Sequence, residues 1–265
     1  MARILYPNGL NMLAEIPEAE AVGEVAQIYR RIKEVQGSPV VNLIWRHLAT
    51  IDGALAWAWP LAEDSRSKIE ITMKPMIDFI DRCVAGHGLG VKLAPPPPPA
   101  VEVLRAYERG NCWNLLATTI LAAVRTGVSP PGGGSEPAYF PAILSSVPAL
   151  LRYGELDDRQ RAQVDELSGV GPGSSSGVRP SLWLHLANWP DLLDEVAASC
   201  PSVLASAGFS ATCDGVLEHA AALLGLAPLR VAPVPASIDH AIGAFRQRLP
   251  EMLLMGRVLI RAASA

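Results

Sequence analysis

The sequence lacks the cysteine and charge patterns that mark metal-binding, disulfide-linked or nucleic-acid-binding proteins. Its four cysteines, in a chain of 265 residues, lie far apart, and no Cys-x-x-C pair is present to hold zinc or to cycle between thiol and disulfide. Acidic and basic residues are interspersed and give a net charge of −4, without the basic stripe that neutralises a phosphate backbone. We therefore expect reduced cysteines, no metal or other cofactor, and no nucleic-acid partner.

Long apolar segments are also missing. The longest strongly apolar run covers residues 115–124, well short of the roughly 20 residues that span a bilayer. Residues 1–16 contain no continuous apolar stretch followed by a small-residue cleavage site, so they do not have the pattern of a secretory signal. These observations predict a soluble cytoplasmic protein that does not enter a membrane.

Hydrophobic residues, by contrast, make up 50% of the chain, enough for a large core without metals or disulfides. They recur at spacings of three and four residues, and alternating β-branched runs are absent, so the pattern predicts an all-α fold. The expected helices cover residues 19–35, 41–61, 66–87, 100–109, 112–126, 158–168, 180–198, 208–224, 236–248 and 250–263.

The sequence Trp-x-His-Leu-Ala occurs twice, beginning at Trp45 and at Trp183. The same offset of 138 residues aligns Tyr107 with Phe245, and matches that share one register indicate an internal duplication. We predict two tandem helical repeats of about 130 residues that pack about a pseudo-twofold axis, with a ligand pocket between them. The domain boundaries that follow are 1–128 for the first repeat, 129–138 for a Gly/Pro linker and 139–265 for the second repeat.

Proline and glycine clusters fall between the expected helices. The proline-rich segments 94–100 and 232–236 are predicted to be semi-rigid connectors between the third and fourth helix of each repeat. Residues 173–177 fit the Gly-x-Ser-x-Gly pattern of a hydrolase nucleophile, and residues 86–90 contain closely spaced glycines. Neither segment follows a predicted strand, so neither a serine hydrolase nor a dinucleotide-binding loop is expected.

Cys83 and His87 stand four residues apart on a predicted helix. They resemble the last part of the Cys-x-x-Cys-x-x-x-His motif of the carboxymuconolactone decarboxylase and alkylhydroperoxidase D-like superfamily, but Ile80 occupies the place of the first cysteine. The resemblance implies a redox protein that uses Cys83 and His87, without the intrahelical disulfide of that superfamily. A packing role for both residues is the alternative.

The whole chain resembles the group I 2-haloacid dehalogenases, which act on D and L substrates. The resemblance rests on short motifs in conserved order, namely Ile28-Tyr29, Arg46 with Leu48-Ala49-Thr50, Gly110-Asn111, and Leu186-Ala187-Asn188-Trp189-Pro190. It implies two helical repeats around one active site, no cofactor, and hydrolytic removal of halide from small 2-haloalkanoic acids by a directly activated water.

The resemblance also implies a set of site residues. Asn111 and Ser181 would position the water, and the substrate pocket would be lined by Val40, Leu43, Leu182 and Trp183. By direct count Leu182 holds the place of the aspartate that activates the water in the family, and leucine cannot accept a proton.

Two hypotheses follow from Leu182. Either another group, such as His185, is the base of a dehalogenase, or the protein binds a small organic acid or another small molecule without catalysis. His185 and His47 occupy equivalent places in the two repeats, and a buried histidine inside an apolar helix is commonly a hydrogen-bonded structural residue. A homodimer is left open.

Overall fold

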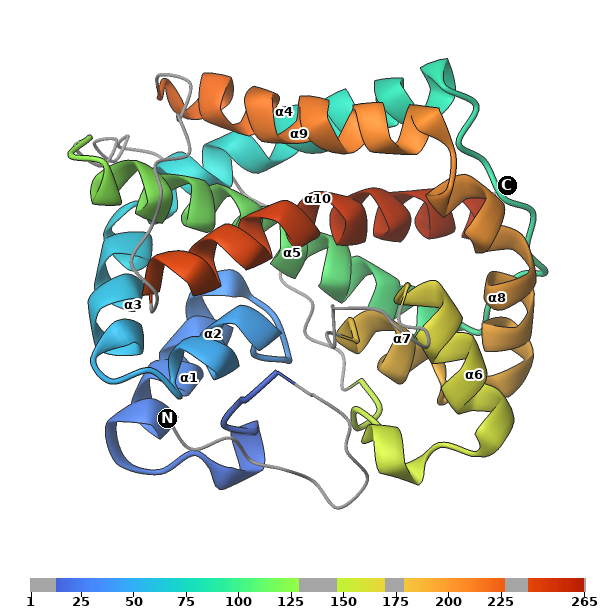
Figure 1. Cartoon of the computed structure of the whole chain (residues 1–265), viewed down its shortest axis with the longest axis horizontal. Helices are drawn as coiled ribbons and strands as arrows, with labels where there is room; N and C mark the ends of the chain where they lie inside the picture. Colours follow the sequence, from blue (N-terminus) through green and yellow to red (C-terminus); the bar gives the residue numbers. More distant parts are fainter. Residues whose placement is uncertain (1–12, 129–146, 170–178, 227–237, 265) are drawn as a thin grey trace.

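The computed structural model describes residues 13–128, 147–169, 179–226 and 238–264 (Figure 1). Within these ranges every regular element is helical, which confirms the predicted all-α class. Two short 3-10 helices cover Glu18–Glu20 and Tyr153–Glu155. The α-helices are α1 (Gly23–Gln36), α2 (Leu43–Leu48), α3 (Ala54–Asp64), α4 (Arg66–Gly86), α5 (Pro98–Arg125), α6 (Asp158–Leu167), α7 (Ser181–Leu186), α8 (Pro190–Leu204), α9 (Ala207–Leu224) and α10 (Ile238–Ala263).

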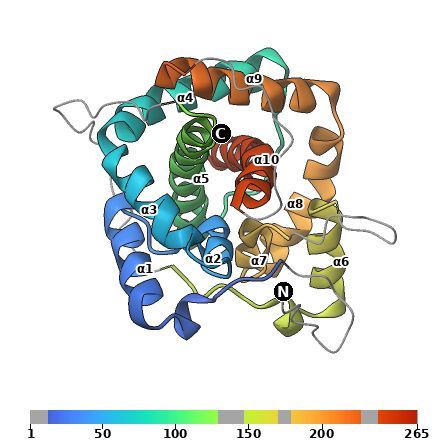
Figure 2. The ribbon, with the colours of Figure 1, turned by 60° about the vertical axis from the view of Figure 1, so that its left-hand side comes forward.

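The helices α5 and α10 lie side by side at the centre of the molecule, and the other helices surround them (Figure 2). The central part of α5 is buried on all sides from Leu115 to Leu121, because its apolar residues do not leave a polar face. The helices α4 and α9 pack together along one side of this pair, and α2 and α7 lie near its opposite side (Figures 1 and 2).

Buried tryptophans fill the core beside α5. Trp45 of α2 packs edge-on against Trp59 of α3, with ring centroids 5.3 Å apart, and Trp113 of α5 stacks on Trp59 at 5.7 Å. Offset and edge-on contacts of this kind are the favourable arrangements for aromatic rings. The first tryptophan of the Trp-x-His-Leu-Ala sequence therefore packs α2 onto the central helix.

Charged side chains also attach α10 to its neighbours. The Arg257 guanidinium donates from Nε to Oδ1 of Asp81 on α4 at 2.7 Å, and from Nη1 to Oε1 of Glu108 on α5 at 3.1 Å. Burial raises the pKa of Glu108, and Arg257 opposes that rise. The network joins three helices that are distant in the sequence.

Two predicted helices, 41–61 and 180–198, are wrong because each is divided in the structure. Gly53 adopts φ 68° immediately before α3, a left-handed conformation that interrupts the first helix and that glycine adopts without steric cost. Pro190 begins α8, and a proline at the first position of a helix needs no backbone N–H donor.

Two predicted breaks are also wrong. The ranges 100–109 and 112–126 lie in the single helix α5, and 250–263 and the described part of 236–248 lie in the single helix α10. Helix α5 continues through Gly110, and α10 continues through Pro250, where both residues are surrounded by the packed centre of the molecule. Tertiary packing there outweighs the local cost of a helix-breaking residue.

Only the first part of the proline-rich segment 94–100 is a connector between α4 and α5, as predicted. Pro97 precedes α5, whereas Pro98 and Pro99 form its first turn. The predicted linker 129–138, the Gly-x-Ser-x-Gly sequence at 173–177 and the connector 232–236 lie outside the described residues.

Among the described helices, no single one is long and apolar enough to cross a membrane. Helices α8 and α9, which meet at a bend of 79°, pass the test of length and composition only as a pair.

Candidate functional site

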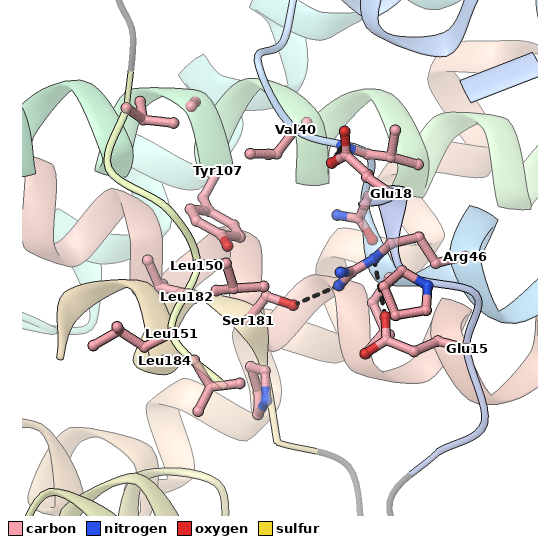
Figure 3. A pocket seen from close by; sticks show the side chains of 18 of the residues that line it. Glu15, Glu18, Val40, Arg46, Tyr107, Leu150, Leu151, Ser181, Leu182 and Leu184 are labelled. Carbon is pink, nitrogen blue, oxygen red and sulfur yellow. Dashed lines mark hydrogen bonds and ion pairs between the residues drawn. The ribbon is translucent and has the colours of Figure 1, made fainter. Parts of the chain in front are cut away.

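A cavity of about 1260 Å³ lies between the N-terminal ends of α2 and α7 and the middle of α5 and α10. Residues of the segments 15–20 and 147–155 complete its wall. Figure 3 shows its two sides: Glu15, Glu18 and Arg46 face it from one side, and a group of leucines faces it from the other. The labelled charged residues and the labelled leucines thus lie on different sides of the cavity, and further charged residues, Arg152, Glu155, Arg161 and Arg248, also belong to its lining.

The start of α2 is fixed to α5 by one asparagine. The Asn42 side chain accepts the backbone N–H of Ile44, as a residue that caps a helix does, and its amide donates to Oδ1 of Asn111 at 2.9 Å. Asn111 is thereby held at the cavity wall with its carbonyl oxygen already hydrogen-bonded. An amide group also has two N–H donors, and Asn111 belongs to the residues that line the cavity.

The sequence-predicted site residues divide into two groups. The residues that line the cavity are Val40, Leu43, Asn111, Ser181 and Leu182. Trp183 and His185 are only 0% and 1% exposed and do not line the cavity. Successive residues of a helix point in different directions, so these two side chains of α7 face the protein interior. Their roles in substrate binding and proton transfer stay predictions, and the geometry gives neither side chain direct access to the cavity.

Residues separated by the offset of 138 line the cavity in pairs. In the pairs Arg46 and Leu184, Tyr107 and Phe245, and Asn111 and Leu249, the earlier residue is the more polar one. In the pairs Leu43 and Ser181, and Gly110 and Arg248, the later residue is the polar one. The offset therefore brings pairs of residues to one cavity without a fixed order of polarity.

A chain of polar groups runs along the cavity wall. Nη2 of Arg46 donates to Oγ of Ser181 at 3.2 Å, and the Ser181 hydroxyl lies near the hydroxyl of Tyr107. The Tyr107 hydroxyl lies 3.3 Å from Nδ1 of His185, and Nε2 of His185 lies 2.7 Å from the carbonyl oxygen of Pro148. The chain connects α2, α7 and α5 to the segment 147–155.

The two ends of this chain determine its direction. A carbonyl oxygen can only accept, so Nε2 of His185 carries the hydrogen, and the neutral ring then accepts at Nδ1 from Tyr107. An arginine can only donate, so Oγ of Ser181 accepts from Arg46 and its own hydrogen is directed toward Tyr107. His185 therefore orients Tyr107 and does not itself reach the cavity.

Burial sets the protonation states of these groups. It lowers the pKa of His185 below the ordinary value of 6.5, and the hydrogen bond to Pro148 opposes this only in part. Burial raises the pKa of Tyr107, and the nearby charge of Arg46 and the Ser181 hydroxyl oppose that rise only in part. At neutral pH both groups are uncharged, which agrees with the direction of the hydrogen bonds.

The two glutamates on the side of Arg46 have different surroundings. Both carboxylate oxygens of Glu18 are engaged, Oε2 by Nζ of Lys33 at 2.8 Å and Oε1 by the backbone N–H of Val41 at 2.7 Å. Among the described residues Glu15 forms one ion pair, in which its Oε2 lies 3.1 Å from Nε of Arg46. Glu18 therefore anchors the segment 15–20, whereas Glu15 only neutralises Arg46.

Sequence reasoning missed Arg46, Glu15, Glu18 and Tyr107 as cavity residues. A signal for Arg46 was present, because Trp-x-His-Leu-Ala is Trp-Arg-His-Leu-Ala in the first copy and Trp-Leu-His-Leu-Ala in the second. Arg46 and Leu184, the residues at the variable position, both line the cavity. No comparable signal identifies the two glutamates, which lie in a segment without helical periodicity.

Cys83 and His87 lie far from this arrangement, at the end of α4. Burial raises the pKa of Cys83, which disfavours the reactive thiolate. Among the described residues no hydrogen bond joins the thiol to the His87 ring, and the His87 side chain packs beside Gly208. The redox hypothesis stays a prediction without a geometric argument in its favour.

No protein-family model and no curated protein matches the sequence. Solved structures do match its fold over nearly the full length. A D-2-haloacid dehalogenase mutant in complex with D-2-CPA has a TM-score of 0.77 and 16% identity, and the match covers 95% of this chain and 96% of that one.

Two further structures, a second D-2-haloacid dehalogenase mutant and a complex of D-2-haloacid dehalogenase with L-LA, both have TM-scores of 0.69. Their identities are 16% and 15%, and each match covers 95% of this chain and 94% of the other. At such identities the similarity shows the fold alone.

Proposed function

We propose that this protein binds a small organic acid with an apolar substituent in the cavity between α2, α5, α7 and α10. The observation that carries the proposal is the amphipathic wall. Polar groups of Arg46, Ser181 and Asn111 face the same space as the apolar side chains of Leu182 and Leu184. A carboxylate needs donors at one end of its site, and its substituent is stabilised by apolar surface at the other. The solved structures of the same fold whose names include D-2-CPA and L-LA support this ligand class.

We also propose that the chain is a duplicated helical unit with pseudo-twofold symmetry. Two ring contacts related by the offset of 138 support it. His47 lies 5.8 Å from Phe245, and His185 lies 5.7 Å from Tyr107, centroid to centroid. Each histidine thus contacts the aromatic residue of the opposite half, the exchange that a twofold axis produces.

Binding without dehalogenation is favoured because the proposed site lacks an accessible base where the family resemblance places one. Leu182 is 1% exposed and lines the cavity with a side chain that cannot accept a proton. His185 donates to Pro148 and accepts from Tyr107, so neither ring nitrogen is available to a water in the cavity.

Hydrolytic dehalogenation by direct attack of water is the second candidate. It is favoured by one observation, the presence of the Glu15 carboxylate at the cavity wall, where it could serve as a base in place of the missing aspartate. In this case the ion pair with Arg46 would have to open before Glu15 could accept a proton from water.

Calorimetric titration with 2-chloropropionate and with lactate, combined with a halide-release assay, tests the proposal. We expect saturable binding of both acids and no halide release by the unmodified protein. The Leu182→Asp variant should gain halide release, whereas Leu182→Asn, which has the same shape but cannot act as a base, should not. A circular dichroism spectrum of each variant establishes that it is folded.

Each alternative result has a definite meaning. Halide release by the unmodified protein that is lost in Glu15→Gln would replace the binding proposal with the second candidate. Absence of saturable binding for both acids would refute the proposed ligand class.

A further inference from the structure

We infer that Arg46 is the residue that recognises the ligand carboxylate, and that Glu15 is an internal carboxylate that the ligand displaces from it. The inference rests on the proposed function, because it assigns the side of the same cavity that contains Arg46. It adds a mechanism of selectivity: the protein carries its own competitor for an anionic ligand.

The Arg46 guanidinium is buried but poorly satisfied. Its side chain is 9% exposed, and within the described part of the chain its aligned hydrogen bond is the one from Nη2 to Oγ of Ser181. Nε of Arg46 and Oε2 of Glu15 are 3.1 Å apart, yet both atoms are buried without a hydrogen-bond partner of acceptable geometry. A guanidinium has five N–H donors in a rigid fork, which fits the two oxygens of a carboxylate. A ligand carboxylate in the cavity can meet this fork with better alignment than Glu15 does.

The Glu15 side chain can leave without moving the backbone that carries it. The backbone N–H of Ile16 donates to the carbonyl of Arg46 at 3.0 Å, and the hydroxyl of Tyr29 donates to the Ile16 carbonyl at 2.9 Å. Glu18, held on both oxygens, fixes the segment three residues later. The Glu15 side chain is 25% exposed, so its carboxylate can turn toward water when it is replaced.

The ion pair between Arg46 and Glu15 selects for ligands that carry a carboxylate. With Glu15 ionised, the arginine is already neutralised, and a ligand must offer a carboxylate to compete for it. A neutral analogue such as lactamide cannot displace Glu15. Glu15 and the ligand compete for the same guanidinium, so removing the Glu15 carboxylate should strengthen carboxylate binding by about tenfold or more.

The test is calorimetric titration of lactate, 2-chloropropionate and lactamide into four proteins: the unmodified chain, Glu15→Gln, the double variant Glu15→Gln/Arg46→Gln, and the control Glu24→Gln. Glu24 is exposed on α1 and lies outside the cavity lining. The double variant removes both charges together, so no unpaired charge is left buried and the fold is not strained by one.

We expect Glu15→Gln to bind both acids about tenfold more tightly or better, with lactamide unchanged and Glu24→Gln within about twofold of the unmodified protein. The double variant should lose the preference for lactate over lactamide. Equal or weaker acid binding by Glu15→Gln, or an unchanged preference in the double variant, would overturn the inference while leaving the proposed function intact. If none of the four proteins binds either acid, the proposed function and this inference both fail.

Discussion

Replacing Asp165 with asparagine should destabilise the protein strongly, because Asp165 balances a buried charge. The Arg179 side chain is only 2% exposed, and its Nε lies 2.5 Å from Oδ1 of Asp165. The Arg179 guanidinium also lies 4.1 Å from the centroid of the Tyr153 ring, and the Tyr153 hydroxyl donates to Oδ2 of Asp165 at 2.8 Å. These three residues attach the segment 147–155, which forms part of the cavity wall, to α6.

The size of the effect follows from the burial of the partner that remains. Breaking a buried ion pair by removing one member costs about 3–5 kcal/mol. Asp165 is itself 28% exposed, so solvent screens part of the interaction, and its replacement by asparagine retains one acceptor oxygen. We therefore expect a loss of about 2–3 kcal/mol, which for a chain of this size lowers the melting temperature by about 4–12 °C.

Urea unfolding followed by circular dichroism measures this loss. The matched control is Asp78→Asn, which removes a carboxylate paired with Lys74 at a surface where both side chains are exposed. An exposed pair contributes about 0–1 kcal/mol. The reasoning would be refuted if the two variants differed in unfolding free energy by less than about 0.5 kcal/mol. Because Tyr153 also lines the cavity, Asp165→Asn should weaken acid binding in the same titrations.

Two further predictions concern the core and the polar chain. Trp113→Ala removes a fully buried ring from contact with Trp45 and Trp59 and should lower the free energy of unfolding by about 3–5 kcal/mol. A loss below about 1 kcal/mol, measured by urea titration, would contradict the packing described. The pKa of His185 is lower in the folded state than its ordinary value of 6.5, so below that pH the unfolded chain binds more protons than the folded chain. The contribution of His185 to the free energy of unfolding is therefore complete above pH 6.5 and declines as the pH falls toward the folded-state pKa. Unfolding free energies measured between pH 7.5 and 5 should therefore fall less steeply in His185→Gln, and parallel profiles would exclude this origin.

The helices that the sequence predicted most closely are those that end at local signals. The predicted range 66–87 corresponds to α4 (Arg66–Gly86), and 208–224 corresponds to α9 (Ala207–Leu224), which begins after the cap Ser206 and ends at Gly225 in a left-handed conformation. Such caps act within one helical turn, so a short window of sequence contains the information. The continuity of α5 and α10 cannot be predicted from such a window. Only the helices packed around them make a glycine or a proline acceptable inside a helix.

The cavity shows the same division. The sequence by itself determined that Trp-x-His-Leu-Ala is repeated and that no carboxylate stands at position 182. The family resemblance predicted that Asn111, Ser181 and Leu182 share a site, and all three line the cavity. Only the tertiary structure decided that Arg46 meets Ser181 from another part of the chain and that Glu15 lies beside Arg46. Helical periodicity depends on neighbours within a turn, whereas the free energy of a buried charge depends on whichever partner the folded chain brings next to it.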